Sequence, residues 1–371
     1  MYIAASLLFV ALNASQRTID RFISIDRLMQ HALEQKVFPG AVLLVMYKGA
    51  IAHHQAYGHH TYDSGSPKVT RDTLFDCASI TKLFTTTVAM QLYDQGLLHL
   101  DASIAHYLPE CPHDKQPITI KDLLLHQSGL RIMDELPVHP GLSVDDIKQI
   151  VFAEPLQHVP GTHYLYDCTN AIILQWVIES ITGKPLNQLV QEQILDPVGM
   201  HTSYTHVPHQ LKLQCAPTGK GYEKTVVTER TYIQGVVHDL KAYCLGGFAG
   251  NAGLFSTAGD LALFARMIRN KGKGIVKEST LNFWLQKHSL LENRALGWAM
   301  APDPSHSCGY CFSPNSYGHL GFTGTSLWCD PDRDVWVILL TNRVYPTIDN
   351  IQIRQLRTVI HDAVLCNLGL V

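Results

Sequence analysis

The segments of this chain that are typical of β-strands lie near its two ends, with helical segments between them. Residues 41–58 form two apolar runs joined by Lys48-Gly49, which is a hairpin signal. Residues 317–341 contain further strand-like runs, the last two joined by a turn at Asp332-Arg333. Between about residues 131 and 240 the pattern is mostly helical with polar loops. This order of segments predicts a mixed helix-and-sheet protein.

The stretch from Phe75 to Gly96 holds a serine and a lysine three residues apart in a segment typical of a helix. That spacing places Ser79 and Lys82 on one helical face. A lysine amine with a depressed pKa can take the proton of a serine hydroxyl and activate it as a nucleophile. The positive end of the helix dipole would oppose protonation of Lys82 and stabilise a nearby oxyanion. Because S-x-x-K also occurs by chance in surface helices, the motif alone leaves the catalytic interpretation open.

Composition places the chain among globular proteins. Its 371 residues are 46% hydrophobic and 16% charged, enough for a substantial core in one or two domains. The formal net charge is -3 with dispersed lysines and arginines, so no nucleic-acid partner is expected. No stretch is long and apolar enough to predict a membrane span with confidence. Residues 1–20 contain a short apolar run, which is either part of a signal peptide or a segment packed on the domain.

Nine cysteines and twenty histidines raise the question of metal binding. An odd, scattered set of cysteines is a poor disulfide framework and favours a reducing compartment. Cys308 and Cys311 form a lone C-x-x-C in a Pro/Ser/Gly-rich loop, without two further zinc ligands at suitable spacing. The pairs His53-His54 and His59-His60 favour edge or surface positions, because neighbours on a strand point to opposite faces. We therefore expect no metal and no cofactor.

Three separated segments, in a fixed order, carry a resemblance to a known family. They are Ser79-x-x-Lys82, a loop centred on Tyr166, and His319-Leu320-Gly321 at the opening of a C-terminal strand. Together they resemble the serine β-lactamase and penicillin-binding-protein family, and above all its branch of class C β-lactamases, D-Ala-D-Ala carboxypeptidases, esterases and cell-wall amidases. The stretches LLLHQSGL, PGTHYLYD and AGLFSTAGDLALF match as well. The resemblance covers roughly residues 25–365.

The resemblance implies an α/β (α+β) fold of the β-lactamase/transpeptidase type. An antiparallel sheet made from both chain ends would be flanked by helices, with a mostly helical subdomain inserted at about residues 100–240. Residues 21–371 would form a single catalytic domain, with the nucleophile in the cleft where the two parts meet. Such an analogy concerns the fold and says little about the substrate.

The resemblance also implies a role for each residue of the site. Ser79 would be the nucleophile and Lys82 its partner base. Tyr166 would carry the proton between the serine and the leaving group, since a lysine cation beside a phenol favours its ionised form. The backbone N–H groups of Ser79 and Phe322 would form the oxyanion hole.

Two positions depart from the family pattern. Cys168 stands two residues after Tyr166, where the family usually has Asn or Asp, and we expect Asn170 or Asp167 to fill that hydrogen-bonding role. His319 stands where the lactamases use a lysine to bind the substrate carboxylate. A neutral or half-charged imidazole anchors a carboxylate weakly at neutral pH. Members with His or Trp there are often esterases or amidases, which disfavours a dedicated β-lactamase.

Four positions are expected to contribute to substrate binding: Asn170, Gly321, Asn251 and Gln127. Asn251 lies in AGNAGLF, where cell-wall members of the group often have histidine. A purely structural role, as a turn residue that tolerates the left-handed conformation, explains this asparagine equally well.

The sequence therefore predicts a serine hydrolase that forms an acyl-Ser79 intermediate on an ester or amide, with a peptidoglycan-derived peptide or amide, or a small ester, as substrate. A β-lactamase or D-Ala-D-Ala carboxypeptidase is the alternative. A catalytically silent binding protein of the same fold is disfavoured, because Ser79, Lys82 and Tyr166 are all present. A metalloprotein would need a local ligand pattern such as H-E-x-x-H. The family often works at the cell envelope whereas the cysteines favour the cytoplasm, and the oligomeric state is open.

Overall fold

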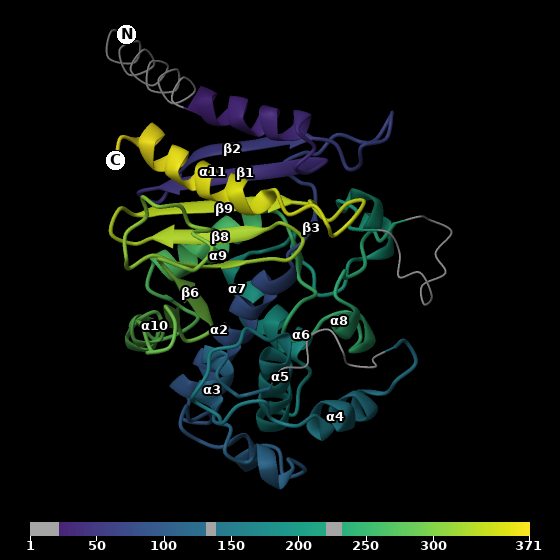
Figure 1. The fold of residues 1–371 in the computed structure, drawn as a ribbon, viewed down its shortest axis with the longest axis vertical. Coiled ribbons are helices and arrows are strands. Elements are labelled where there is room, and N and C mark those ends of the chain that lie inside the picture. Colours follow the sequence, from purple (N-terminus) through teal and green to yellow (C-terminus); the bar gives the residue numbers. More distant parts are fainter. Residues whose placement is uncertain (1–21, 131–138, 220–231) are drawn as a thin grey trace.

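The computed structural model describes residues 22–130, 139–219 and 232–371. The predicted N-terminal segment 1–20 lies outside the described residues. Figure 1 shows a central sheet with helices on both faces and a mainly helical region extending from one of them. Within the described ranges, no helix has the length and apolar character needed to cross a membrane.

Seven strands form the antiparallel sheet, in the order β2-β1-β9-β8-β7-β6-β5. The two ends of the chain meet at its centre, because β1 pairs with β9 from Ala41 opposite Thr341 to Tyr47 opposite Val335. The seven strands are β1 (Gly40–Tyr47), β2 (Ala50–Gly58), β5 (Arg294–Ala295), β6 (Trp298–Met300), β7 (Tyr317–Leu320), β8 (Ser326–Asp330) and β9 (Val335–Thr341). The expected antiparallel sheet built from both chain ends is confirmed.

The hairpin predicted at residues 41–58 is also confirmed. Lys48 and Gly49 join β1 to β2 with φ angles of 51° and 79°, the left-handed conformation that tight hairpin turns need. β2 is an edge strand of the sheet, as expected for His53 and His54, whereas His60, beyond the end of β2, is buried and not at the surface as expected. In the described residues, no group of three or more His, Cys, Asp or Glu side chains is placed to hold a metal ion. All nine cysteines, including Cys308 and Cys311, are free thiols.

Residue alternation along β1 explains why helices cover both faces of the sheet. Val42, Leu44 and Met46 belong to the core cluster under the α2 side, whereas alternate residues such as Leu43 and Val45 belong to the opposite cluster. The second cluster contains α11 and the helix formed by residues 22–34, which lie along the same face in Figure 1. Helices therefore cover both faces of the sheet.

The other helices occupy the middle of the chain and its C-terminus. In chain order they are α2 (Thr81–Asp94), α3 (Ile120–Leu125), α4 (Val144–Ala153), α5 (Cys168–Thr182), α6 (Leu186–Val190), α7 (Asp196–Val198), α8 (Leu240–Cys244), α9 (Ala258–Arg269), α10 (Glu278–Trp284) and α11 (Ile353–Leu368). Helices α3 to α7 fall in the range where the helical subdomain is expected. Its extent as a separate unit stays a prediction.

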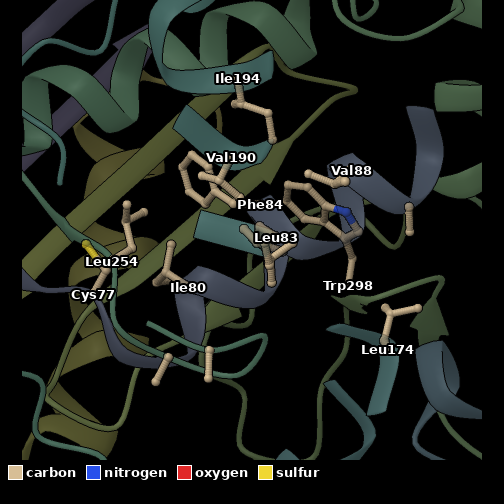
Figure 2. Packing of buried hydrophobic residues seen from close by; sticks show 14 of the residues in the cluster. Cys77, Ile80, Leu83, Phe84, Val88, Leu174, Val190, Ile194, Leu254 and Trp298 are labelled. Atoms are coloured by element: carbon tan, nitrogen blue, oxygen red, sulfur yellow. The ribbon is translucent and has the colours of Figure 1, made fainter. Parts of the chain in front are cut away.

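The helix predicted from Phe75 to Gly96 begins later than expected. Phe75–Asp76 is strand β3, paired with β4 (Phe255–Ser256), and a single tight helical turn, Ala78–Ile80, precedes α2. Residues Thr81 to Leu92 are all buried, so α2 is the central helix of the molecule rather than an amphipathic surface helix. Figure 2 shows this packing. Leu83, Phe84 and Val88 of α2, with Ile80 just before it, lie among side chains of other segments, which include Val190, Ile194, Leu254 and Trp298.

Candidate active site

A strained turn presents Ser79 at the N-terminus of α2. Ala78, just before it, has a φ of 47°, which is uncommon for a residue with a side chain and costs free energy. The Asp76 carboxylate holds this turn by accepting hydrogen bonds from the N–H groups of Ala78 (2.8 Å) and His238 (2.7 Å). Burial raises the pKa of Asp76 to about 6. The turn leaves Ser79 half-buried at the wall of a cleft of about 610 Å³.

Lys82 lies on the first turn of α2 and is bonded on three sides. Its Nζ donates to Ser79 Oγ at 2.8 Å, to the carbonyl oxygen of Asn251 at 3.1 Å, and to Cys168 Sγ at 3.5 Å. It also lies 5.2 Å from the centre of the Tyr166 ring. The predicted Ser79–Lys82 contact is therefore present in the structure. Cys168 itself contacts the lysine at the position where Asn170 or Asp167 was expected.

The predicted depression of the Lys82 pKa is wrong. Burial by itself disfavours the ammonium, but the Cys168 sulfur and the Tyr166 oxygen favour it, and their combined effect raises the pKa of Lys82 above its ordinary value. Lys82 is therefore a cation at neutral pH. It stabilises negative charge on its neighbours instead of removing the proton of Ser79 itself.

Tyr166 faces the same cleft from the segment that leads into α5. Its ring lies 4.5 Å from that of His126 and 6.0 Å from that of His319, measured between centroids. His126 takes the left-handed conformation that ends α3 (φ 55°). Burial, with the charges of Arg294 and Lys82, holds the pKa of His126 well below its usual value. Tyr166 therefore lies between one buried cation, Lys82, and two imidazoles.

The third motif is tied directly to the serine turn. Thr323 Oγ1 donates to the carbonyl oxygen of Asp76 at 2.7 Å, and Thr325 Oγ1 donates to that of Cys77 at 3.0 Å. A Cβ atom on Gly321 would lie 1.9 Å from Thr325 Oγ1 and 2.6 Å from the Cys77 carbonyl, so only glycine allows this approach. Phe322, which follows, lines the cleft beside Ser79. The two predicted oxyanion N–H groups therefore belong to segments held together by hydrogen bonds.

His319 lines the cleft, but as a neutral side chain. Its Nδ1 donates to the carbonyl oxygen of Leu320 at 2.8 Å, so Nε2 carries the lone pair. Nε2 is buried and has no hydrogen-bond partner. Burial, with the charges of Lys82 and Arg294, holds the pKa of His319 well below its usual value. Of the two expected states, neutral or half-charged, the lowered pKa favours the neutral one, in which His319 is an acceptor.

The four predicted substrate-binding residues have different positions. Gly321 lines the cleft, whereas Asn170, Asn251 and Gln127 are buried and are not among the lining residues. Asn251 meets Lys82 through its carbonyl oxygen, and the Gln127 amide donates to Ser289 Oγ at 2.5 Å. These positions give no support to direct substrate contacts by the three buried residues.

The sequence analysis missed two cleft residues, Tyr164 and Arg294, and the buried His126 that packs against Tyr166. His126 and Tyr164 lie within LLLHQSGL and PGTHYLYD, two stretches that carry the resemblance, so a signal was available for both. Arg294 belongs to β5, a strand of two residues that is too short for a periodic pattern.

Comparison with known proteins agrees with this geometry. A family model described as Beta-lactamase matches residues 25–360. The chain is 31% identical over 365 residues to a putative D-alanyl-D-alanine carboxypeptidase of Escherichia coli K12, covering 89% of this chain and 84% of the relative. It is 34% identical over 350 residues to an N-acetylmuramyl-L-alanine amidase of Bacillus subtilis 168, covering 84% of this chain and 79% of the relative.

The fold has solved counterparts. A class C beta-lactamase in complex with cefoxitin superposes with a TM-score of 0.74 at 18% identity, covering 94% of this chain and 99% of the other. At that identity the likeness concerns the fold alone. The match of the family model over nearly the whole chain, together with the relatives above 30% identity, shows that the chain belongs to the beta-lactamase family of serine hydrolases.

Proposed function

We propose that this serine hydrolase cleaves an amide or ester bond of a peptidoglycan-derived fragment through an acyl-Ser79 intermediate. The observation that carries the proposal is the contact of 2.8 Å between Lys82 Nζ and Ser79 Oγ at a strained turn in the cleft wall. The names of the two relatives support the substrate class, since one denotes cleavage at D-alanyl-D-alanine and the other cleavage between muramic acid and L-alanine.

Tyr166 is the proposed proton carrier. The Lys82 ammonium donates its hydrogen bond to Ser79 Oγ, so the serine hydrogen has to turn to another acceptor. In the proposed step the neighbouring Tyr166 oxygen, as phenolate, takes this proton while Oγ bonds to the substrate carbonyl carbon. Tyr166 then returns the proton to the leaving nitrogen or oxygen as the scissile bond breaks.

The backbone N–H groups of Ser79 and Phe322 are the proposed oxyanion hole. Thr323 and Thr325 fix the separation of the two segments through their bonds to the Asp76 and Cys77 carbonyls. In the second half of the reaction, Tyr166 takes a proton from a water molecule that attacks the acyl-serine. Ser79 Oγ leaves as the ester breaks and recovers that proton, which restores the enzyme.

Dedicated β-lactamase activity is the less favoured candidate. The position where the lactamases carry a fixed cation holds a neutral imidazole here. An enzyme that cleaves the muramyl-alanine amide or D-alanyl-D-alanine needs no lysine at that point if the substrate is held elsewhere in the cleft.

A substrate panel tests the proposal. Purified wild type and Ser79→Ala are compared on an N-acetylmuramyl-L-alanine peptide, a peptide ending in D-alanyl-D-alanine, a p-nitrophenyl ester and nitrocefin. We expect kcat/KM on one of the two wall peptides to exceed that on nitrocefin by about 100-fold or more. Nitrocefin as the best substrate would establish the β-lactamase instead, and activity that survives in Ser79→Ala would contradict the serine mechanism.

A further inference from the structure

Arg294 is a buried cation in the wall of the cleft. It begins β5, lines the cleft, and is 4% exposed. None of the ion pairs among the described residues involves it. Its Nε and Nη2 atoms are buried and have no hydrogen-bond partner. A buried guanidinium without a partner lowers stability, so a functional reason for it is expected.

Arg343, another buried arginine of the same cleft, differs from Arg294 because its guanidinium is hydrogen-bonded to the protein. Arg343, 7% exposed, donates hydrogen bonds to the backbone carbonyls of Phe322, Ile348 and Asn350 at 2.6–3.0 Å. Arg294 makes no such set of bonds. Its guanidinium instead lies against the Tyr164 ring, with Cζ 5.8 Å from the ring centroid. This cation–π contact and a side-chain hydrogen bond to Tyr164 hold the group in place, while Nε and Nη2 stay without a partner.

The two nitrogens without a partner, Nε and Nη2 of Arg294, are placed to bind one ligand together. Nε–H and Nη2–H lie on the same edge of a guanidinium and point in parallel, which matches the two oxygens of a carboxylate. The acidic residue nearest in sequence, Glu292, also lines the cleft, but its Oε1 accepts the N–H of Asn293 at 2.9 Å. The charge of Arg294 also acts on His126 and His319, two residues packed around Tyr166, so its field reaches the catalytic groups.

We propose that Arg294 binds a free carboxylate of the substrate through Nε–H and Nη2–H, and that the substrates of this enzyme are therefore acidic peptide-like amides or esters. The inference rests on the proposed acyl-Ser79 chemistry and adds the recognition group. It explains how the cleft can hold an acidic substrate although His319 carries no charge.

Matched boronic acids provide the test, because a boronic acid forms a reversible adduct with a reactive serine whatever the natural substrate. Dissociation constants are measured for carboxyphenylboronic acids substituted at the meta or para position, and for the uncharged carbamoyl analogue of each. In the wild type we expect one isomer to bind about tenfold or more tightly as the carboxylate than as the amide.

Three variants test whether Arg294 causes the preference for the carboxylate over the amide. Arg294→Met, of similar volume, should bring the ratio to about one, whereas Arg294→Lys should keep part of it, because a point charge lacks the two-pronged geometry. Lys287→Gln removes a nearby exposed cation and should leave the ratio unchanged. An unchanged ratio in Arg294→Met, or no carboxylate preference in the wild type for either isomer, would overturn the inference.

Two further results separate the possible failures. The melting temperature of Arg294→Met should be unchanged or higher than that of the wild type, because an unpaired buried charge is removed. A clear drop would mean that Arg294 supports the fold, and would count against the binding role. If none of the boronic acids binds the wild type, the serine chemistry itself fails, whereas binding without a carboxylate preference leaves that chemistry standing and removes only the role of Arg294.

Discussion

Two groups of side chains in this cleft differ in how their polar atoms are used. The catalytic group, Ser79, Lys82 and Tyr166, is supported from within, with Lys82 bonded to a hydroxyl, a carbonyl and a thiol. The other group, His319 and Arg294, has buried nitrogens with no partner in the described protein. The first group is arranged before any substrate arrives. The second is completed only by a ligand, which is what substrate recognition requires.

The largest effects should come from the catalytic group. Lys82→Ala and Tyr166→Phe should each lower kcat by about 10²–10⁴, the usual contribution of general acid–base catalysis. The double variant should be little worse than either single one, because residues that act as a unit are not additive. Steady-state kinetics on the best panel substrate measures this, with the exposed Lys184→Ala as the matched control. Multiplicative losses would mean that the lysine and the tyrosine act separately.

A smaller loss of kcat is expected at Gly321, where the loop after β7 approaches the serine turn. Gly321→Ala would place a Cβ atom 1.9 Å from Thr325 Oγ1 and force the loop away from the serine turn. Because Phe322 N–H would move with the loop, kcat should fall by about 10²–10³, as on loss of an oxyanion donor. An unchanged kcat in a folded variant would show that this N–H takes no part in catalysis.

Recognition by His319 should be independent of pH near neutrality. His319→Gln should lower kcat/KM by about tenfold, because the amide oxygen of glutamine does not occupy the place of Nε2 in the cleft. Since burial holds the folded-state pKa of His319 well below that of a free imidazole, the ring stays neutral throughout the pH range around neutrality. The pH profiles of wild type and variant should therefore have the same shape over that range. An inflection present only in the wild type would show that His319 is charged.

The lowered pKa of His319 also determines how the stability of the fold changes with pH. Because the unfolded chain binds a proton at His319 more readily than the folded one does, this residue stabilises the fold above its unfolded-state pKa. That stability is lost as the pH falls towards the folded-state pKa. Denaturant titrations of wild type and His319→Gln should therefore converge as the medium becomes acidic. A difference that grows on acidification would contradict the buried neutral ring.

The smallest effect on kcat is expected at Cys168, whose sulfur accepts the longest of the three hydrogen bonds of Lys82, at 3.5 Å. Cys168→Ser keeps an acceptor of similar size, so kcat should change by about threefold or less. Cys168→Ala removes the acceptor and should cost more than the serine variant. Equal kinetics for the two variants would show that the sulfur only fills space.

Sequence alone was sufficient where chemistry depends on local geometry. The three-residue spacing of Ser79 and Lys82 brings their atoms together on any helical turn, and the apolar runs of β1 and β9 specify central strands. It was insufficient where a property depends on distant residues. The pKa of Lys82 depends on burial and on Cys168, and that of His319 depends on burial and on Lys82 and Arg294, none of which is close to it in sequence. Arg294 reaches the cleft only because the short strand β5 pairs with β6.

The most direct test of the central claim is covalent labelling of the serine. Wild type, Tyr166→Phe and Ser79→Ala are treated with a fluorophosphonate and digested with trypsin, and the adduct is located by mass spectrometry. The account predicts one adduct on Ser79 in the wild type, slower labelling in Tyr166→Phe and none in Ser79→Ala. Labelling that persists unchanged in Ser79→Ala would contradict the assignment of the nucleophile, and with it the acyl-enzyme mechanism.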